Sequence, residues 1–351
     1  MKILMYADPH FSTYSSIVRS RGKKYSTRLE NLIETLNWIE QTADEQACDM
    51  VICLGDFFDK CDLHSEELTA LQEISWINRP HYFIAGNHEM GRGNLEFSSA
   101  HLFNLCPNTV TVDRPTCISD CENDTNLVLL PYILEVNRQP LENYLNSYKD
   151  ATNIIVLSHN DIAGIQMGQY QSKDGFAVDE IEKSCSLFIN GHLHNGTNIG
   201  RKIINLGNIT GQNFSEDAYN YTHQCMILDT GLHDIKFIEN PHAMNFYKLD
   251  LTKCEDIKEV ERVVLTLKGN SVVTAKVGTE MGQQVRDLLD KASNILEYRV
   301  VLNVTMTTAG VTEECKDLGI NHIDRFITYI KSNIGIDDII LEELSYVAGN
   351  T

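Results

Sequence analysis

Residues 50–59 read Met-Val-Ile-Cys-Leu-Gly-Asp-Phe-Phe-Asp, an apolar run that ends at a glycine and is followed by two carboxylates. A short, unbroken apolar run of this kind is typical of a strand that is buried on both faces of a parallel sheet. Gly55 gives the backbone the freedom to turn sharply where the strand ends. The stretch therefore predicts a strand that delivers Asp56 to one edge of a sheet.

Four further polar clusters follow strand-like runs in the same way. The runs are residues 2–7, 81–85, 153–157 and 187–189, and the clusters after them are Asp8-Pro9-His10, Gly86-Asn87-His88-Glu89, Ser158-His159-Asn160 and Gly191-His192-Leu193-His194. Side chains that are far apart in sequence can meet when their strands end at the same edge of a sheet. Together the five clusters hold enough carboxylate, amide and imidazole groups to bind a pair of divalent cations.

The chain between these clusters alternates strands with helices. Residues 28–46 carry apolar side chains at helical spacing and predict an amphipathic helix, and a second helix is expected over residues 65–77. This order predicts an α/β fold with a largely parallel core that is covered on both faces. Residues 203–238 contain short alternating segments, which favour antiparallel strands that close the sheet.

A domain boundary is expected near residues 246–251, so that residues 1–245 form one domain and residues 246–351 form a second. The second domain is expected to be a small α+β appendage, and it contains none of the five clusters. Its expected strands are 263–267, 272–277, 298–306 and 337–344, and its expected helices are 281–292 and 320–334. The chemistry is therefore expected in the first domain.

The composition limits the possible functions. The 351 residues carry a formal net charge of −20, which argues against a simple basic nucleic-acid binder but allows an enzyme whose bound cations reverse the local field. The ten cysteines are irregularly spaced, which favours free thiols in a reducing compartment. No apolar run is long enough for a signal peptide or a membrane span, so a cytoplasmic protein without membrane contact is expected.

Two clusters place paired side chains on one side of an extended segment. Asp8 and His10 are two residues apart, and so are His192 and His194. A carboxylate and an imidazole, or two imidazoles, can therefore reach the same cation. His159 supplies one more nitrogen at the end of its strand. For any single histidine the alternative is a hydrogen-bonded structural role, but five clusters in order after strand ends favour a metal site.

The remaining clusters add oxygen ligands. Asp56 has two carboxylate oxygens that can bridge two cations, although an N-cap role is its alternative. Asn87 offers a carbonyl oxygen and His88 an imidazole, and because neighbours in an extended chain point apart, one is expected to face the metal and the other the substrate. Asp59 is expected to orient a neighbouring group instead of binding metal.

The ordered series D-x-H, G-D-x-x-D, G-N-H-[DE], H and G-H-x-H, from residue 8 to residue 194, resembles the calcineurin-like metallophosphoesterase superfamily. Within it, Gly55-Asp56-Phe57-Phe58-Asp59 is similar to the G-D-x-F-D stretch of SbcD-type DNA repair exonucleases, including the short forms carried by bacteriophages. Phe214-Ser215-Glu216 resembles the later F-x-E stretch. Asn208 and Glu89 depart from the more common Ser and Asp, and neither is a proposed ligand.

The resemblance implies a four-layer sandwich of two mixed sheets flanked by helices, with a small C-terminal capping domain. It also implies two divalent metal ions, with Mn²⁺ as the family expectation. One metal would be held by Asp8, His10 and His194 and the other by Asn87, His159 and His192, with Asp56 bridging them. His88, which is adjacent to a ligand, is placed to stabilise the transition state or to protonate the leaving oxygen.

The function expected from these features is a manganese-dependent DNA nuclease that acts 3′-to-5′ on duplex ends and endonucleolytically on single strands. The alternatives are a phosphodiesterase for small substrates such as cyclic nucleotides, and a non-catalytic regulatory scaffold. The resemblance further implies an SbcC-like coiled-coil ATPase partner and a homodimer. The apolar side chains of the expected 65–77 helix are candidates for the dimer contact, although packing within the chain explains them equally well; they are Leu68, Leu71, Ile74 and Trp76.

A basic segment follows the first cluster. No acidic residue lies between Phe11 and Leu29, and five basic residues are concentrated there: Arg19, Arg21, Lys23, Lys24 and Arg28. Because the segment leaves the first metal motif, it is expected to contact the DNA backbone near the mouth of the site. The alternative is a solvated loop without a ligand.

Overall fold

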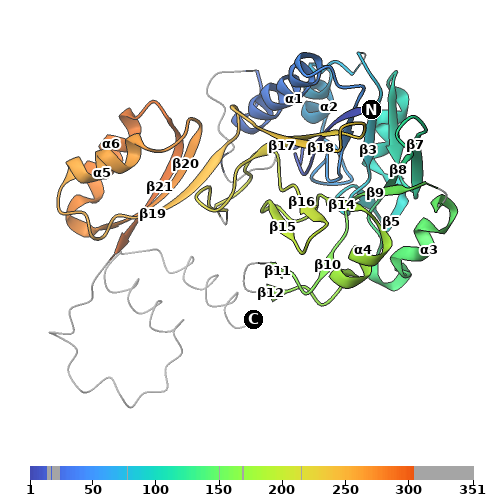
Figure 1. The fold of residues 1–351 in the computed structure, drawn as a ribbon. Helices are drawn as coiled ribbons and strands as arrows, with labels where there is room; N and C mark the ends of the chain where they lie inside the picture. Colours follow the sequence, from blue (N-terminus) through green and yellow to red (C-terminus); the bar gives the residue numbers. More distant parts are fainter. Residues whose placement is uncertain are drawn as a thin grey trace, which may run out of the picture. The chain divides into compact units, whose positions relative to one another are not determined.

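The computed structural model describes residues 1–13, 17, 24–76, 78–149, 151–167, 170–214 and 216–303, and the first 303 residues form one compact unit. Two six-stranded sheets make up most of this unit (Figure 1). The expected helix at 320–334 and strand at 337–344 lie outside the described residues.

The first sheet has the strand order β18-β17-β1-β2-β3-β6. Its strands are β1 (Lys2–Tyr6), β2 (Met50–Cys53), β3 (His81–Ile84), β6 (Thr109–Val112), β17 (Gln224–Asp229) and β18 (Asp234–Glu239). The strands β1, β2, β3 and β6 run parallel, and β17 pairs antiparallel with both β1 and β18. The parallel core that the sequence predicts is therefore present, with an antiparallel hairpin at one side.

The second sheet has the order β15-β16-β14-β9-β8-β7. Its strands are β7 (Thr116–Asp120), β8 (Thr125–Leu130), β9 (Asn153–Ser158), β14 (Leu187–Asn190), β15 (Thr197–Ile199) and β16 (Ile203–Asn205). The four strands β8, β9, β14 and β16 run parallel, while β7 and β15 are antiparallel edge strands. Both sheets are thus mixed.

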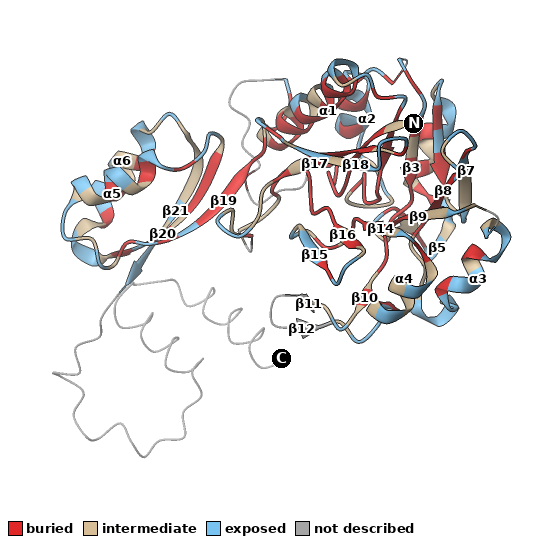
Figure 2. Ribbon diagram, in the orientation of Figure 1, coloured by how far each residue is buried: buried red, intermediate tan, exposed pale blue. Residues whose placement is uncertain are grey.

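The two sheets pack face to face with helices on their outer faces. One apolar cluster joins residues of both sheets, such as Ile52 of the first and Leu157 of the second. A separate cluster packs α1 (Thr27–Glu45) and α2 (Ser65–Leu71) on the first sheet, and another packs α3 (Leu141–Leu145) and α4 (Val178–Ser184) on the second. Figure 2 shows the buried strands inside the sandwich. This arrangement confirms the expected four-layer α/β architecture.

Helix α1 follows from its apolar spacing. Leu29, Leu32, Leu36 and Ile39 recur every three or four residues and are all buried against the first sheet. The Ser26 hydroxyl accepts a hydrogen bond from the Leu29 amide and caps the helix N-terminus. Burying one such side chain contributes about 1.5–3 kcal/mol.

Helix α2 is shorter than the expected 65–77 helix. It ends at Leu71. The chain then turns back towards β3, and Pro80 disfavours helical backbone at the residue before it. Leu71, Ile74 and Trp76 are buried in the core of this chain, and Leu68 is 40% exposed. Packing within the chain therefore accounts for most of the apolar side chains proposed for a dimer contact.

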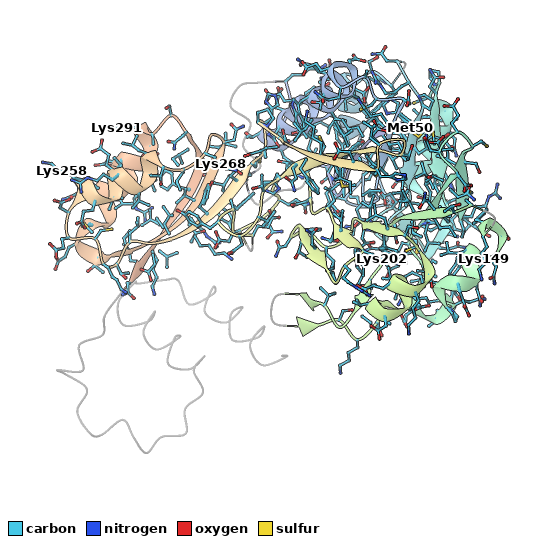
Figure 3. The ribbon with its side chains drawn as sticks, in the orientation of Figure 1. Met50, Lys149, Lys202, Lys258, Lys268 and Lys291 are labelled. Carbon is cyan, nitrogen blue, oxygen red and sulfur yellow. The ribbon has the colours of Figure 1, made fainter. Side chains whose placement is uncertain are left out.

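A third, smaller sheet follows the sandwich. It contains β19 (Asn245–Asp250), β20 (Ser271–Gly278) and β21 (Ile295–Asn303), all parallel, joined by α5 (Ile257–Leu265) and α6 (Gly282–Lys291). The exposed Lys258 and Lys291 lie on these two helices (Figure 3). The sheet begins next to the expected boundary at 246, and the division into two domains stays a prediction.

The expected strand at 263–267 is wrong, because most of this stretch is the end of α5. Val260 and Val264 are four residues apart and both are buried, which is helical spacing. The Asp256 side chain caps the helix by accepting hydrogen bonds from the Lys258 and Glu259 amides. The run of β-branched residues at 263–264 favoured a strand, and the cap and the burial against the sheet outweigh that preference.

Short elements connect these layers. They are the strands β4 (Met90–Gly91), β5 (Asn94–Ser98), β10 (Ile162–Ala163), β11 (Gln166–Met167), β12 (Tyr170–Gln171) and β13 (Phe176–Ala177), and the 3-10 helices η1 (Ser99–Leu105), η2 (Glu135–Asn137), η3 (Asn146–Tyr148) and η4 (Thr279–Met281). Among the described residues, no helix combines the length and the apolar character needed to cross a membrane.

Candidate metal centre

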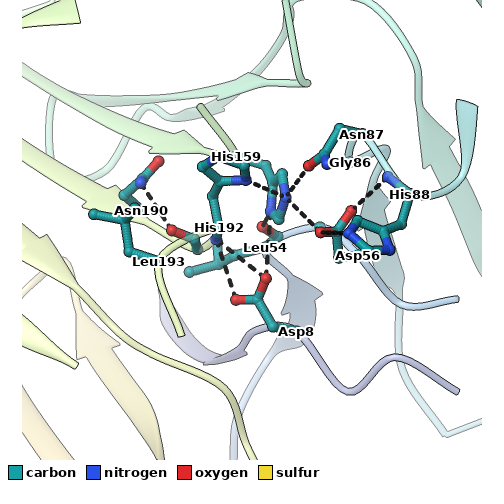
Figure 4. Close-up of polar contacts among 12 residues, drawn as sticks. Asp8, Leu54, Asp56, Gly86, Asn87, His88, His159, Asn190, His192 and Leu193 are labelled. Carbon is teal, nitrogen blue, oxygen red and sulfur yellow. Dashed lines mark hydrogen bonds and ion pairs between the residues drawn. The ribbon is translucent and has the colours of Figure 1, made fainter. Parts of the chain in front are cut away.

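The five polar clusters meet where parallel strands of both sheets end. Three of them follow β1, β2 and β3 of the first sheet, and two follow β9 and β14 of the second. Figure 4 shows Asp8, Asp56, Asn87, His159 and His192 turned towards one another at this place. The structure therefore brings together side chains that are separated by nearly two hundred residues in the chain.

The turns that carry these side chains are strained. Asp8, His10, Asp56 and His192 have φ angles of 51°, 45°, 46° and 68°, in the left-handed region that residues with a Cβ avoid. Such residues cost of order 1–3 kcal/mol each and persist where the surrounding structure enforces them. These four are among ten non-glycine residues with positive φ in the described part of the chain, and all four stand at positions that the sequence singles out as ligands, which supports a functional role for the turns.

Gly55 shows why the turn after β2 needs a glycine. Its φ is +103°, and a Cβ at this position would lie 2.2 Å from Nδ1 of His159. A side chain here would therefore displace the imidazole. The sequence predicted a sharp turn at Gly55, and the close approach of His159 is an additional reason for the glycine.

Asp8, His10 and His194 form the first group. Nε2 of His10 lies 3.2 Å from Nε2 of His194 and 4.0 Å from Oδ1 of Asp8. One ligand atom from each of the three residues lies within 4.8 Å of the others. Two imidazole nitrogens and a carboxylate that converge in this way can share one cation.

Asp56, His159 and His192 form the second group, and Asn87 adjoins it. Nε2 of His159 lies 3.1 Å from Oδ2 of Asp56, 3.2 Å from Oδ1 of Asn87 and 3.3 Å from Nδ1 of His192. The same Oδ2 of Asp56 lies 3.8 Å from Nε2 of His10 in the first group. The Asp56 carboxylate thus lies between the two groups.

Hydrogen bonds on the far side of three imidazoles determine which nitrogen is available to a cation. Nδ1 of His159 donates to the Leu54 carbonyl at 2.7 Å, Nδ1 of His10 pairs with Asp59 at 3.1 Å, and Nε2 of His192 pairs with Asp161 at 3.0 Å. Each of these bonds fixes the ring and leaves the other nitrogen facing the clusters. The donor set therefore fits a pair of bound metal ions.

The charges of the site point to the same conclusion. Burial raises the pKa of Asp8 to about 7. Nearby His159 lowers this pKa, and the negative charge of Asp56 raises it further. Burial lowers the pKa of His159, but the Asp56 carboxylate outweighs this effect and raises it to about 10. A cation bound between these groups would displace the proton, because both compete for the Nε2 lone pair. Two desolvated carboxylates are compensated best by positive charge.

His88 differs from the other histidines because its side chain is 40% exposed. Its backbone amide donates to Oδ1 of Asp56 at 3.0 Å, and Nδ1 donates to the Asp59 carbonyl at 2.9 Å. The hydrogen bond with the Asp59 carboxylate raises its pKa to about 9, although partial burial opposes this shift. One ligand atom of His88 also lies within 4.8 Å of those of His10 and Asp56.

Two residues that hold the site together were missed by sequence reasoning. Asp161 orients His192, and its position two residues after His159 was the signal that could have indicated it. Glu89 is fully buried and accepts hydrogen bonds from the amides of Phe58 and Gly86, both at 2.8 Å. Glu89 thereby joins the turns after β2 and β3.

The basic segment is only partly described, because Arg19, Arg21 and Lys23 lie outside the described residues. Lys24 is exposed and pairs with Glu73 at 2.5 Å. The expected DNA contact of Arg28 is wrong, because its side chain is 1% exposed and donates to the carbonyls of Pro9 and Gly211, both at 2.7 Å. Arg28 lies in the first turn of α1, which faces the protein interior, and there it holds backbone carbonyls.

Residues 1–196 hold all five clusters, and they match the family model described as calcineurin-like phosphoesterase. The chain belongs to this family. This calcineurin-like phosphoesterase retains the His/Asp clusters that bind two metals, and it is a hydrolase.

Relatives and solved structures extend the comparison. The chain is 24% identical over 302 residues to the probable exonuclease subunit 1 of Escherichia phage T5, which covers 84% of this chain and 85% of that protein. A dimetal phosphatase from Danio rerio is 14% identical, with a TM-score of 0.42 over 68% of this chain and 98% of the other. The calcineurin-like phosphoesterase YfkN of Bacillus subtilis is 13% identical, with a TM-score of 0.39 over 68% and 88%.

Proposed function

We propose that this phosphoesterase is a dimetal-dependent DNA nuclease that digests duplex ends 3′-to-5′ and cuts single strands internally. The observation that carries the proposal is the relative of phage T5, which is named as a probable exonuclease subunit and aligns over 302 residues. That length extends beyond residues 1–196, where the general family model matches. The similarity therefore includes chain outside the part that all phosphoesterases of the family share.

The proposed metal ligands are those that the strand ends bring together. Asp8, His10 and His194 would hold one ion, Asn87, His159 and His192 the other, and Asp56 would bridge them. When bound, the two ions supply an activated water and neutralise charge on the phosphate oxygens. The mixed nitrogen and oxygen donors suit manganese, iron, cobalt and zinc, and manganese is the proposed metal.

The protein groups around these ligands have separate proposed tasks. His88 would protonate the leaving oxygen, because Nδ1 is held by the Asp59 carbonyl and Nε2 is left to carry the transferable proton. Asp59 would orient both His88 and His10, and Asp161 would orient His192. The partial exposure of His88 lets a phosphodiester reach it.

An SbcC-like ATPase and a second copy of the chain are the proposed partners. The word "subunit" in the name of the phage T5 relative supports an assembly. Size-exclusion chromatography with light scattering would measure the copy number, and co-purification with such an ATPase would test the heterologous partner.

An assay with three substrates tests the proposed function. Purified protein with Mn²⁺ is incubated with linear duplex DNA, single-stranded circular DNA and bis-p-nitrophenyl phosphate, a small chromogenic diester. We expect cleavage of both DNA substrates and the loss of that cleavage on chelation with EDTA. Activity confined to the small diester would favour a small-substrate phosphodiesterase, and no activity on any of the three would favour a scaffold.

The His88→Ala variant tests the proton donor. We expect kcat on DNA to fall about 10²- to 10⁴-fold while Mn²⁺ affinity stays close to that of the wild type. A variant that cleaves DNA at the wild-type rate would exclude this role. A variant that loses a metal ion would show instead that His88 is a ligand.

A further inference from the structure

A cavity of about 410 Å³ adjoins the candidate metal centre through Tyr132. The Tyr132 ring lines the cavity, and its centroid is 5.8 Å from that of the His192 ring. Met90, which also lines it, is the second residue after His88 in the chain. A volume of this size lies within the range of about 300–1,000 Å³ that small-molecule sites occupy. The cavity is therefore near enough and large enough for a chemical group attached to a phosphate at the metal centre.

The backbone around Tyr132 is held on both sides. The Tyr132 amide donates to the Ala85 carbonyl at 2.9 Å, at the end of β3. The buried Asn160 receives a hydrogen bond from the Ile133 amide at 2.9 Å and donates to the Pro131 carbonyl at 2.8 Å. The Tyr132 hydroxyl, in contrast, forms no hydrogen bond with any described residue. The ring is thus presented to the cavity from a fixed loop.

The rim of the cavity carries a free positive charge. Arg114 lines the cavity and is exposed, and its guanidinium forms no ion pair with any residue that the structure describes. The neighbouring Asp113 carboxylate is paired with His101 at 3.0 Å. In a chain of net charge −20, an exposed arginine that no described residue pairs, at the rim of a cavity whose wall also carries Tyr132, is suited to a phosphate.

We propose that this cavity binds the nucleotide next to the scissile phosphate, with its base stacked on Tyr132 and its outer phosphate on Arg114. The inference rests on the proposed nuclease function and adds the substrate-binding residues. Every base has a π-face, so stacking on an aromatic ring is tolerant of sequence. Asn137 at the cavity wall adds polar atoms for a base edge. Tyr132 is accordingly a substrate-binding residue for nucleic acid, and the chemical step at the metal centre does not use it.

The test compares Tyr132→Ala, Tyr132→Phe and wild type on two substrates with Mn²⁺. For a single-stranded oligonucleotide, Tyr132→Ala is expected to raise KM roughly five- to 150-fold, and Tyr132→Phe to stay near wild type because the ring is kept. Both variants are expected to keep the wild-type kcat on bis-p-nitrophenyl phosphate, because neither substitution replaces a proposed metal ligand. The nitrophenyl rings of this diester can themselves stack on Tyr132, so KM is compared on DNA alone. Tyr219→Ala, which removes an exposed tyrosine that does not line the cavity, is the matched control.

Abasic oligonucleotides identify the group that Tyr132 contacts. With abasic residues at the last two positions of the oligonucleotide, the KM of the wild type should rise by the same factor that Tyr132→Ala shows on normal DNA. The KM of Tyr132→Ala should not rise further, because the stacking contact is already absent. An equal loss of kcat on the oligonucleotide and on the small diester would overturn the inference and make Tyr132 a support for His192. If wild type cleaves DNA and Tyr132→Ala does so equally well, the subsite is wrong while the nuclease function stands. If wild type cleaves only the small diester, both the nuclease function and the subsite are wrong.

Arg114→Gln tests the phosphate contact separately. Loss of one phosphate contact should reduce the slope of log affinity against log salt by about 0.7 for single-stranded DNA, with hydrolysis of the small diester unchanged. An unchanged slope would remove Arg114 from the subsite.

Discussion

At the residue scale, the site depends on groups that do not face a metal. His10, His159 and His192 each direct one nitrogen to the clusters because an acceptor holds the other nitrogen. For His192 this acceptor is the half-buried carboxylate of Asp161, which lies 3.0 Å from Nε2. Groups of this kind keep a ligand in the correct tautomer and orientation, so their removal weakens metal binding without removing a ligand.

Replacing Asp161 by alanine tests this dependence. We expect Mn²⁺ affinity to fall about 10- to 100-fold, because His192 loses the partner that fixes its ring. Isothermal titration calorimetry measures the affinity, and circular dichroism checks that the fold is retained. Glu261→Ala, at an exposed acidic position on α5, is the control and should bind Mn²⁺ as wild type does. Wild-type affinity in Asp161→Ala would contradict the orienting role.

At the element scale, the strand-end turns define the site. The turn after β2 has to pass beneath His159, and only a glycine at position 55 leaves room for the imidazole. The same turn needs a φ of +103°, a backbone conformation in which a side chain is strained. A side chain at position 55 would therefore both clash with His159 and strain the backbone, and a glycine that has only the positive φ separates the two effects.

Gly55→Ala is expected to lose Mn²⁺ binding and to lower the free energy of unfolding by more than backbone strain alone explains. Gly164→Ala is the matched control, because Gly164 has a φ of +85° and nothing within 4 Å of the added Cβ. That control should cost only the strain, about 1–2 kcal/mol, and should retain Mn²⁺ binding. Denaturant unfolding and calorimetry measure both quantities. Equal effects of the two substitutions would disprove the clash with His159.

The packing of α1 on the first sheet makes stability depend on pH. Burial raises the pKa of Glu40 on α1 to about 7, with nearby Arg79 opposing the shift. The nearest nitrogen of His81 on β3 lies 3.5 Å away, and no described residue donates a hydrogen bond to the Glu40 oxygens. Because the folded state holds this proton more tightly than the unfolded chain, the contribution of Glu40 to stability is present below pH 4.5 and is lost as the pH rises to about 7.

Glu40→Gln removes this ionisation. Between pH 4.5 and pH 8 the wild type should lose up to about 3 kcal/mol of free energy of unfolding through Glu40, and the variant should not. Urea unfolding at the two pH values measures the difference. A difference in free energy of unfolding between variant and wild type that is the same at both pH values would show that Glu40 ionises normally in the folded protein.

At the scale of the whole molecule, the sequence predicts the layers and the meeting point of the clusters because both follow from local patterns. Apolar runs before Gly55 and Gly86 identify buried strands, and parallel strands end at a common edge. The role of Arg28 could not be predicted, because a basic residue looks the same in sequence whether it binds solvent, phosphate or buried carbonyls. The contacts of Glu89 with the amides of Phe58 and Gly86 join separate strand ends, and no local pattern contains them.

Strand ends of two sheets build one centre for two metal ions. Anomalous X-ray scattering from a crystal of the Mn²⁺-loaded protein would locate both ions. We predict two manganese peaks, one bound by Asp8, His10 and His194 and the other by Asn87, His159 and His192, with the Asp56 carboxylate contacting both. A single peak, or two peaks without a shared Asp56, would show that the strand ends do not form a centre for two ions.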